Sequence, residues 1–350
     1  MNLRGSAEKQ SFRFGNEELY FCFNLFGKSS FGIKDYGMSE SVILVTGAAG
    51  YIGSILVPQL LNKGHRVIAI DNFMYQQTSL LDCCYHPKLT VVRGDARDKN
   101  LISEQIKRAD VIFPLACFTG APLCDRFPIE ARGVDLEAVR LILKLRSRKQ
   151  RIIFPTTNSG YGIGKPGVSC DETTPLRPIS LYGRLKVEAE KAVLDGGNSI
   201  TLRLATVFGA SPRMRLDLLV NDFVYRAVHD GFLVLFESHF KRNYIHIRDV
   251  VRAFSHCLNS FERMKNEPYN VGLSDCNISK RELCEEIKKQ IPSFYFVEAE
   301  VGEDPDKRDY IVSNEKIEKT GFKPQVSLSD GIQELVKGYQ IIKRSEYANS

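Results

Sequence analysis

The sequence has no apolar run long enough to cross a membrane. Its longest, from Val111 to Phe118, has 8 residues and contains Pro114, whereas a transmembrane helix needs about 20. It also lacks the polar excess of a disordered chain, since 43% of its residues are hydrophobic and 26% are charged, as in ordinary globular proteins. The 350 residues therefore predict one large or two modest folded domains and no membrane partner.

Metal-site and disulfide patterns are also missing. The nine cysteines include no CxxC pair and no metal-binding spacing with the histidines, so no metal ligand is predicted. Their number is odd, and a bridge between the adjacent Cys83 and Cys84 would be strained. We expect reduced thiols, most of them buried as small apolar side chains, in a cytoplasmic protein.

Positive charge exceeds negative charge only mildly over the whole chain. Lys and Arg together number 48 and Asp and Glu 42, which gives a net charge of +6. Nucleic-acid binding requires clustered positive charge, so no nucleic-acid partner is expected. A modest excess of basic residues suits a small anionic ligand, such as a pyrophosphate, equally well.

Residues 1–37 show no lasting periodicity. An aromatic cluster from Tyr20 to Phe26 is broken by Asn24 and is too short and too poorly flanked for a signal peptide. We expect either a disordered or loosely docked extension, or a segment upstream of a natural start at Met38. The residues themselves do not choose between the two.

From residue 42 onward, strand and helix patterns alternate. Continuous apolar runs are typical of strands covered on both faces, as in a parallel sheet, and they occupy residues 42–45, 67–70, 89–92, 111–113 and 152–154. Helix-length stretches between and after them are 50–62, 100–108, 136–146 and 180–194. This alternation predicts an α/β fold with a Rossmann-like, doubly wound parallel sheet. After about residue 205 it loosens, which indicates a smaller second lobe.

A glycine-rich turn, TGAAGYIG, follows the first strand and opens the first helix. Gly47 permits the tight turn, Gly50 lets backbone N–H groups approach a pyrophosphate, and Gly53 lets helix and strand pack closely. The unpaired N–H groups at the helix start then attract the phosphates. Asp71, 18 residues past Gly53 at the end of the second strand, can accept hydrogen bonds from a ribose diol and would repel a 2′-phosphate. The cofactor predicted is therefore NAD.

Further cofactor contacts are expected at strand ends and in the glycine turn. Asp95 and Ala96 follow the third strand, and Leu115 and Ala116 end the fourth, at the carboxyl edge where a dinucleotide lies. The complete set of predicted NAD-binding positions is Gly47, Gly50, Tyr51, Ile52, Gly53, Asp71, Asn72, Asp95, Ala96, Leu115, Ala116, Tyr182 and Lys186. We assign residues 38–205 to the NAD-binding domain and 206–350 mainly to the substrate-binding lobe, with some segments returning to the sheet.

Tyr182 and Lys186 are four residues apart in a predicted helix, so they share one face. A neighbouring cation lowers the pKa of a phenol, which makes it a usable general base. Such a pair can also be a structural helix pair. What favours catalysis is the segment TTNSGYG at the end of the fifth strand, because it places Thr157 at the edge of the sheet, where the reactive ring of the cofactor is expected.

In these motifs the chain resembles the extended short-chain dehydrogenase/reductase family, in its nucleotide-sugar epimerase and dehydratase branch. The resemblance covers about residues 42–340. It implies that Tyr182 takes a proton from a sugar hydroxyl, usually at C4, while hydride passes to the nicotinamide. Lys186 would hold the nicotinamide ribose and lower the tyrosine pKa, and Thr157 would stand at the family's hydrogen-bonding Ser or Thr.

The resemblance also implies substrate contacts. Arg242 and Arg308 resemble arginines that bind the nucleotide diphosphate, and Asn221 resembles an asparagine at the nucleotide end of the substrate. The predicted substrate-binding residues are Thr119, Gly120, Ala121, Asn158, Ser159, Thr206, Arg215, Asn221, Arg242 and Arg308. A surface salt bridge or a cap is an equally good interpretation of each arginine alone.

Departures from the family pattern narrow the chemistry. Dehydratases of this branch carry Asp-Glu directly after the Thr, where this chain has Asn158 and Ser159, neither of which can supply that proton transfer. Asp135 stands nearest to the family's asparagine in the helix after the fourth strand. Oxidation at C4, with or without return of the hydride, is the chemistry that remains.

Three stretches resemble a narrower group that contains the GDP-heptose 4-dehydrogenases: residues 158–164, 211–215 and 303–309. The expected activity is therefore NAD-dependent oxidation of a nucleotide-diphosphate sugar to the 4-keto sugar. Two alternatives stay open at this point: a 4-epimerase, which uses the same residues, and a non-catalytic NAD-binding module. A homodimer is expected from the family alone.

Overall fold

Seven strands form one parallel sheet in the computed structural model, which describes residues 9–14, 17–22, 40–165, 167–299 and 308–342. In spatial order its strands are β13 (Glu267–Val271), β9 (Ser199–Leu204), β7 (Arg151–Thr157), β6 (Val111–Pro114), β3 (Val42–Thr46), β4 (Arg66–Asp71) and β5 (Leu89–Arg93). Every neighbouring pair is parallel. The order reverses between β3 and β6, which opens a crevice at their carboxyl ends.

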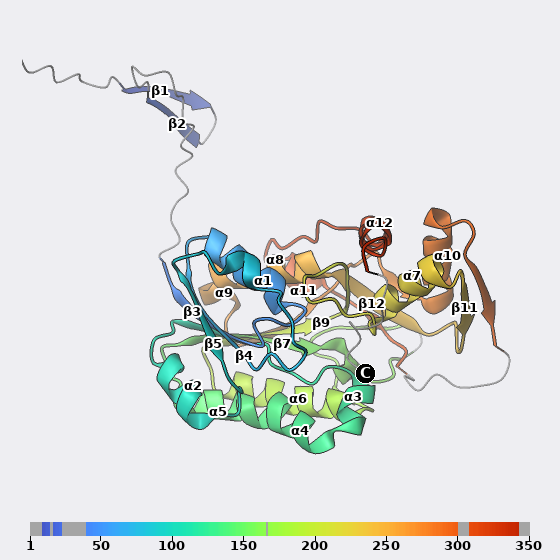
Figure 1. Cartoon of the computed structure of the whole chain (residues 1–350), viewed down its shortest axis with the longest axis horizontal. Helices are drawn as coiled ribbons and strands as arrows, with labels where there is room; N and C mark the ends of the chain where they lie inside the picture. Colours follow the sequence, from blue (N-terminus) through green and yellow to red (C-terminus); the bar gives the residue numbers. More distant parts are fainter. Residues whose placement is uncertain (1–8, 15–16, 23–39, 166, 300–307, 343–350) are drawn as a thin grey trace, which may run out of the picture. The chain divides into compact units, whose positions relative to one another are not determined.

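Helices cover both faces of this sheet (Figure 1). On one face lie α1 (Gly53–Asn62) and α8 (Ile247–Asn259), and on the other lie α2 (Lys99–Ile106), α5 (Ala138–Leu145) and α6 (Leu181–Asp195). Successive strand residues point to opposite faces, so Ile43 joins the first core and Leu44 the second. This is why the strands are continuous apolar runs and why the predicted α/β, Rossmann-like class is confirmed.

All five strands predicted up to residue 154 are present and are one to four residues longer than predicted. The predicted helix 136–146 begins earlier, as a π-helical turn, η2 (Gly133–Glu137), that continues into α5. α6 begins where predicted because the Ser180 side chain accepts a hydrogen bond from the Gly183 N–H and caps the helix. Short elements flank the site: η1 (Leu81–Cys83), α3 (Ala121–Arg126), α4 (Pro128–Arg132) and η3 (Asn158–Tyr161).

Small sheets and helices follow residue 205. The sheets are β10 (Thr206–Phe208), β12 (Lys241–His246) and β14 (Asn277–Ser279) together; β11 (Phe232–Leu235) with β15 (Tyr295–Glu298); and β16 (Ile311–Val312) with β8 (Ser169–Cys170). The helices are α7 (Leu219–His229), α9 (Phe261–Met264), α10 (Lys280–Gln290), α11 (Glu315–Glu318) and α12 (Leu328–Gly338). β13 returns to the main sheet beside β9.

A separate unit, Met1–Ser39, contains an antiparallel pair of strands, β1 (Lys9–Phe14) and β2 (Glu17–Cys22). The expectation of an extension without regular structure did not foresee these strands. The missed signal is Gly15-Asn16 between the two segments, a dipeptide typical of tight hairpins. Residues 1–8, 15–16 and 23–39 lie outside the described residues.

Two further features bear on the sequence predictions. Within the residues that the structure describes, no helix is both long and apolar enough to cross a membrane. The cysteines with described side chains are free thiols, and all of them are buried except Cys84, which is exposed, and Cys117, which is half-buried.

Candidate active site

A cavity of about 740 Å³ lies at the carboxyl ends of the sheet strands. It occupies the crevice where the strand order reverses, the place at which doubly wound sheets bind ligands. Of the predicted functional residues, those that line it are Gly47, Gly50, Tyr51, Ile52, Gly53, Asp71, Asn72, Asp95, Ala96, Leu115, Ala116, Thr119, Gly120, Ala121, Thr157, Ser159, Tyr182, Lys186, Thr206, Arg215, Arg242 and Arg308. Asn158 and Asn221 do not belong to its lining.

The glycine turn forms one wall of this cavity because side chains have no room there. Gly47 has a positive φ of 67°, and a Cβ on it would lie 2.6 Å from the backbone nitrogen of Ala116. A Cβ on Gly53 would lie 2.5 Å from the carbonyl oxygens of Gly47 and Ala48. The turn therefore packs closely against the loop after β6, and no side chain covers its backbone at the glycines. Such an uncovered backbone cradle fits the pyrophosphate of a dinucleotide.

Asp71 ties the turn to the end of β4. Its Oδ2 accepts a hydrogen bond from the Ala49 N–H at 2.9 Å, and its Oδ1 accepts from the Phe73 N–H at 2.8 Å and from Gln77 Nε2 at 3.2 Å. Burial raises the pKa of this carboxyl. A carboxylate has about four acceptor positions, so these three donors leave room for a hydroxyl of an adenosine ribose. The residues present therefore fit NAD.

Asp95 is held by its neighbour Arg97. The guanidinium donates to both carboxylate oxygens, at 2.9 and 2.7 Å, and this pairing lowers the pKa of Asp95. Both oxygens of the carboxylate thus face a cation on the rim of the cavity. An Asp95 contact with the adenine edge stays a prediction.

Thr157, Tyr182 and Lys186 come together in the same cavity although they belong to two different elements. Thr157 ends β7, and its hydroxyl donates to Ser159 Oγ at 2.9 Å while accepting from the Ser159 N–H at 3.1 Å. Tyr182 and Lys186 lie one turn apart near the start of α6. The spacing in the sequence therefore produces the predicted convergence of a hydroxyl, a phenol and an ammonium.

The electrostatic setting of Tyr182 differs from the sequence prediction. Burial raises its pKa well above the ordinary value, the nearby Cys117 and Asp135 raise it further, and the cation that lowers it most is Arg215. The prediction assigned that lowering to Lys186. In the structure the Lys186 ammonium lies 4.2 Å from the centre of the Phe154 ring, in a cation–π contact. Sequence reasoning missed Arg215 in this role because it lies 33 positions from Tyr182 along the chain.

Three predicted arginines line the substrate side. Arg215 is bonded to Asp217, with Nε at 3.2 Å from Oδ1, and Arg242 donates to the Lys241 carbonyl at 2.9 Å. Arg308 donates to the Ser159 hydroxyl, which itself accepts from Thr157. A guanidinium, a serine and a threonine thus form one hydrogen-bonded chain beside Tyr182. Further polar residues that sequence reasoning missed also line the cavity, among them Arg213, Asp217, Lys280 and Tyr310.

The two predicted asparagines lie outside the lining of the cavity. Asn221 is fully buried: its Oδ1 accepts from the Gly209 N–H at 3.0 Å, and its Nδ2 donates to the Arg215 carbonyl at 2.8 Å and to the Tyr51 hydroxyl at 3.3 Å. It therefore shapes the cavity wall from behind. Asn158 is also buried, and its amide atoms have no hydrogen-bond partner within the described part of the chain.

Replacing Asn221 with alanine should destabilise the fold. Three hydrogen bonds are lost and the buried Gly209 N–H and Arg215 carbonyl are left unpaired, which costs about 2 to 4 kcal/mol. Denaturant titration measures this change in the free energy of unfolding. Asn72→Ala is a suitable comparison because the Asn72 side chain caps an exposed turn, bonded to the Met74 N–H. A loss no larger than that of Asn72→Ala would contradict the structural role of Asn221.

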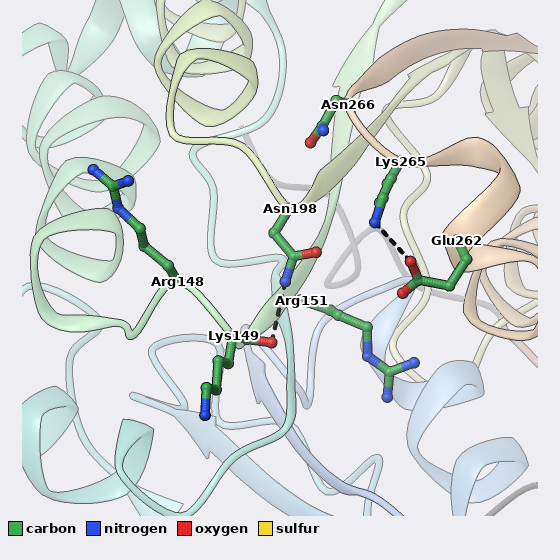
Figure 2. Close-up of a pocket in the computed structure, with 7 residues that line it drawn as sticks. All are labelled: Arg148, Lys149, Arg151, Asn198, Glu262, Lys265 and Asn266. Atoms are coloured by element: carbon green, nitrogen blue, oxygen red, sulfur yellow. Dashed lines mark hydrogen bonds and ion pairs between the residues drawn. The ribbon is translucent and has the colours of Figure 1, made fainter.

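A second hollow, of about 550 Å³, lies at the amino edge of the sheet (Figure 2). It is lined by Arg148, Lys149, Arg151, Asn198, Glu262, Lys265 and Asn266. Lys265 pairs with Glu262 at 2.6 Å, and Asn198 donates to the Lys149 carbonyl at 3.1 Å. These side chains join the starts of β7, β9 and β13, so packing of the strand ends accounts for them. The candidate active site is the cavity at the carboxyl edge.

The fold and this cavity define an NAD-binding enzyme with a Tyr–Lys pair on a doubly wound sheet. Residues 43–272 match the model of the NAD dependent epimerase/dehydratase family. The chain belongs to this family, and NAD is its cofactor.

Relatives and solved structures agree with this assignment. UDP-glucuronic acid decarboxylase 1 of Arabidopsis thaliana is 26% identical over 87% of this chain and 71% of its own length, and a protein of Methanocaldococcus jannaschii named as a putative UDP-glucose 4-epimerase is 26% identical over 84% and 97%. The structure of UDP-glucose 4-epimerase from Thermotoga maritima with UDP-glucose superimposes with a TM-score of 0.76 at 25% identity, and covers 86% of this chain and 99% of that one.

Proposed function

We propose that the protein catalyses NAD-dependent oxidation at C4 of a nucleotide-activated sugar, GDP-heptose or a similar one, to the 4-keto sugar. The observation that carries the proposal is the convergence of Thr157, Tyr182 and Lys186 in the cavity that the glycine turn opens. A hydroxyl placed among these groups has a proton acceptor and a hydrogen-bond donor within reach, and the cradle aligns the cofactor beside it.

Tyr182 is proposed as the base that receives the C4 hydroxyl proton. Its burial raises the phenol pKa, so the base form depends on nearby positive charge. Arg215 supplies part of that charge. When bound, NAD accepts the hydride and adds a positively charged ring. Thr157 is proposed to orient the substrate hydroxyl and Lys186 to hold the nicotinamide ribose.

The side chains after Thr157 favour a keto product over loss of water. Dehydration needs an acid and a base at these positions, and Asn158 and Ser159 supply neither. Ser159 is already bonded to Thr157 and Arg308. The cavity-lining arginines Arg215, Arg242 and Arg308 are proposed to bind the diphosphate, since a planar guanidinium can contact two phosphate oxygens.

A 4-epimerase is the second candidate function. It is favoured by the similarity to proteins of Methanocaldococcus jannaschii and Thermotoga maritima that are named as UDP-glucose 4-epimerases, and it uses the same residues. In this case the keto sugar stays bound, turns over and recovers the hydride on its other face. A homodimer and a cytoplasmic location are proposed with both functions.

Incubation of the purified protein and NAD with a panel of sugar nucleotides tests the proposal. The panel contains GDP-heptose, GDP-mannose, UDP-glucose and UDP-glucuronic acid, with products identified by NMR and NADH followed by absorbance. A 4-keto sugar formed with equimolar NADH supports the dehydrogenase. A C4-inverted sugar without net NADH identifies the epimerase instead. Conversion of none of the four by protein that binds NAD would favour a non-catalytic NAD-binding module.

A further inference from the structure

A buried carboxyl, Asp135, lies behind the proposed catalytic pair. It is 1% exposed and stands in the middle of the π-helical turn η2, a distortion often found at functional sites in helices. η2 is in contact with α4, α5 and α6, and α6 carries Tyr182 and Lys186. Figure 1 shows α3, α4 and α6 on the same face of the sheet. Asp135 is thus within the electrostatic reach of the catalytic helix.

Neutral groups surround this carboxyl on most sides. Its Oδ1 accepts from the Phe118 N–H at 2.7 Å, and its Oδ2 lies 3.8 Å from Cys124 Sγ, which also donates to the Phe118 carbonyl at 3.0 Å. The Cys117 thiol is a further donor to Asp135. Burial and the proximity of Asp135 raise the pKa of Cys117 to about 12, and burial raises that of Cys124 as well, so both thiols keep their protons and act as donors.

Beyond the two thiols, the charged and titratable groups around Asp135 come from α6 and α3. Lys186 on α6 is the cation that acts on it, Tyr182 on α6 feels its charge, and Asp125 on α3 is the carboxylate beyond Cys124. The Lys186 ammonium, whose charge lowers the pKa of Asp135, also lies 4.2 Å from the centre of the Phe154 ring. Burial favours the neutral form of this carboxyl, and the charge of Lys186 favours the ionised form.

We propose that Asp135 is a positioning residue whose proton controls the proton affinity of Tyr182. This inference rests on the proposed function. When Asp135 is ionised, its negative charge disfavours the Tyr182 phenolate and raises the pKa of Tyr182, whereas the positive charge of Arg215 lowers that pKa. When Asp135 holds a proton, that opposition disappears and the base form of Tyr182 becomes easier to reach. The carboxyl acts through Tyr182 and Lys186 and needs no contact with the substrate.

The pKa of Asp135 agrees with this geometry. Burial raises it from 3.8 to about 6, and Lys186 acts in the opposite direction. The folded protein therefore binds a proton that the unfolded chain has released between these two pH values. Stability must fall as the pH rises through this interval, and ionisation of Asp135 is complete only above it.

Asp135→Asn tests the inference, because asparagine keeps the acceptor for the Phe118 N–H and removes the charge. We expect the limb of the pH profile of kcat that reports Tyr182 to move to lower pH. The fall in stability between about pH 4 and 6 should also be smaller in the variant, by the contribution of Asp135, while other buried carboxyls such as Asp71 keep theirs. Glu130→Gln on α4 is the matched control, since it removes an exposed carboxylate one turn earlier; its pH profile should equal that of the unchanged protein.

A measurement on the unchanged protein tests the inference even if the Asp135→Asn variant folds poorly. Calorimetric titration of NAD in two buffers of different ionisation enthalpy measures the protons exchanged on binding. We expect an exchange that varies most steeply around pH 6. A constant exchange across this range, or an Asp135→Asn profile that superimposes on the original, would overturn the inference. If no sugar nucleotide reacts, the proposed function fails, while the stability and calorimetric measurements still decide the role of Asp135.

Discussion

Tyr182→Phe is expected to reduce kcat on the preferred sugar nucleotide by about 10² to 10⁴-fold, the contribution typical of a general base. Phenylalanine keeps the ring, which packs against the core beside α6, and removes only the hydroxyl that receives the substrate proton. NAD affinity should change little because the glycine turn and Asp71 are untouched. Initial rates and a fluorescence titration with NAD measure the two quantities separately.

Tyr244→Phe is the control for this substitution. Tyr244 is fully buried outside the cavity lining, and its hydroxyl has no hydrogen-bond partner within the described residues. Loss of that hydroxyl should leave both kcat and stability close to their original values. Retention of turnover by Tyr182→Phe, with the control unchanged, would show that another group removes the proton.

The sequence was sufficient to predict the fold because strands and helices of this class have strong local signals. A parallel strand covered on both faces has an unbroken apolar run, and residues 42–45 and 67–70 are such runs within β3 and β4. The glycine turn is an equally local signal, because all the positions at which its backbone requires glycine lie within eight consecutive residues. The positions predicted from such short-range constraints, those of the glycine turn, line the cavity.

Contacts across long stretches of sequence were harder to foresee. Asn221 was predicted to face the substrate, yet it bonds Gly209, Arg215 and Tyr51 behind the wall. The direction of an amide on α7 depends on how that helix meets the segment 209–215 and the glycine turn, and no periodic pattern in the sequence reports this. The same limit explains why Arg215 was not predicted as the cation that lowers the pKa of Tyr182 most.

Gly47→Ala is expected to damage both the fold and the cofactor site. The added methyl group meets the backbone of Ala116 at 2.6 Å, and alanine disfavours a φ of 67°. Left-handed strain and overpacking together should cost about 2 to 5 kcal/mol. The turn can relieve the contact only by moving away from the loop after β6, which displaces the cradle, and NAD affinity should fall by about 10²-fold.

Gly64→Ala separates conformational strain from steric contact. Gly64 has a φ of 85°, and a Cβ built there meets nothing within 4 Å. This variant should lose only about 1 to 2 kcal/mol of stability and should bind NAD normally. Denaturant titration and NAD binding on both variants test the comparison. If the two variants lost equal stability and kept equal NAD affinity, the close approach of the glycine turn to Ala116 would have no functional consequence. A specific loss in Gly47→Ala would show that the cradle depends on the bare backbone at this position.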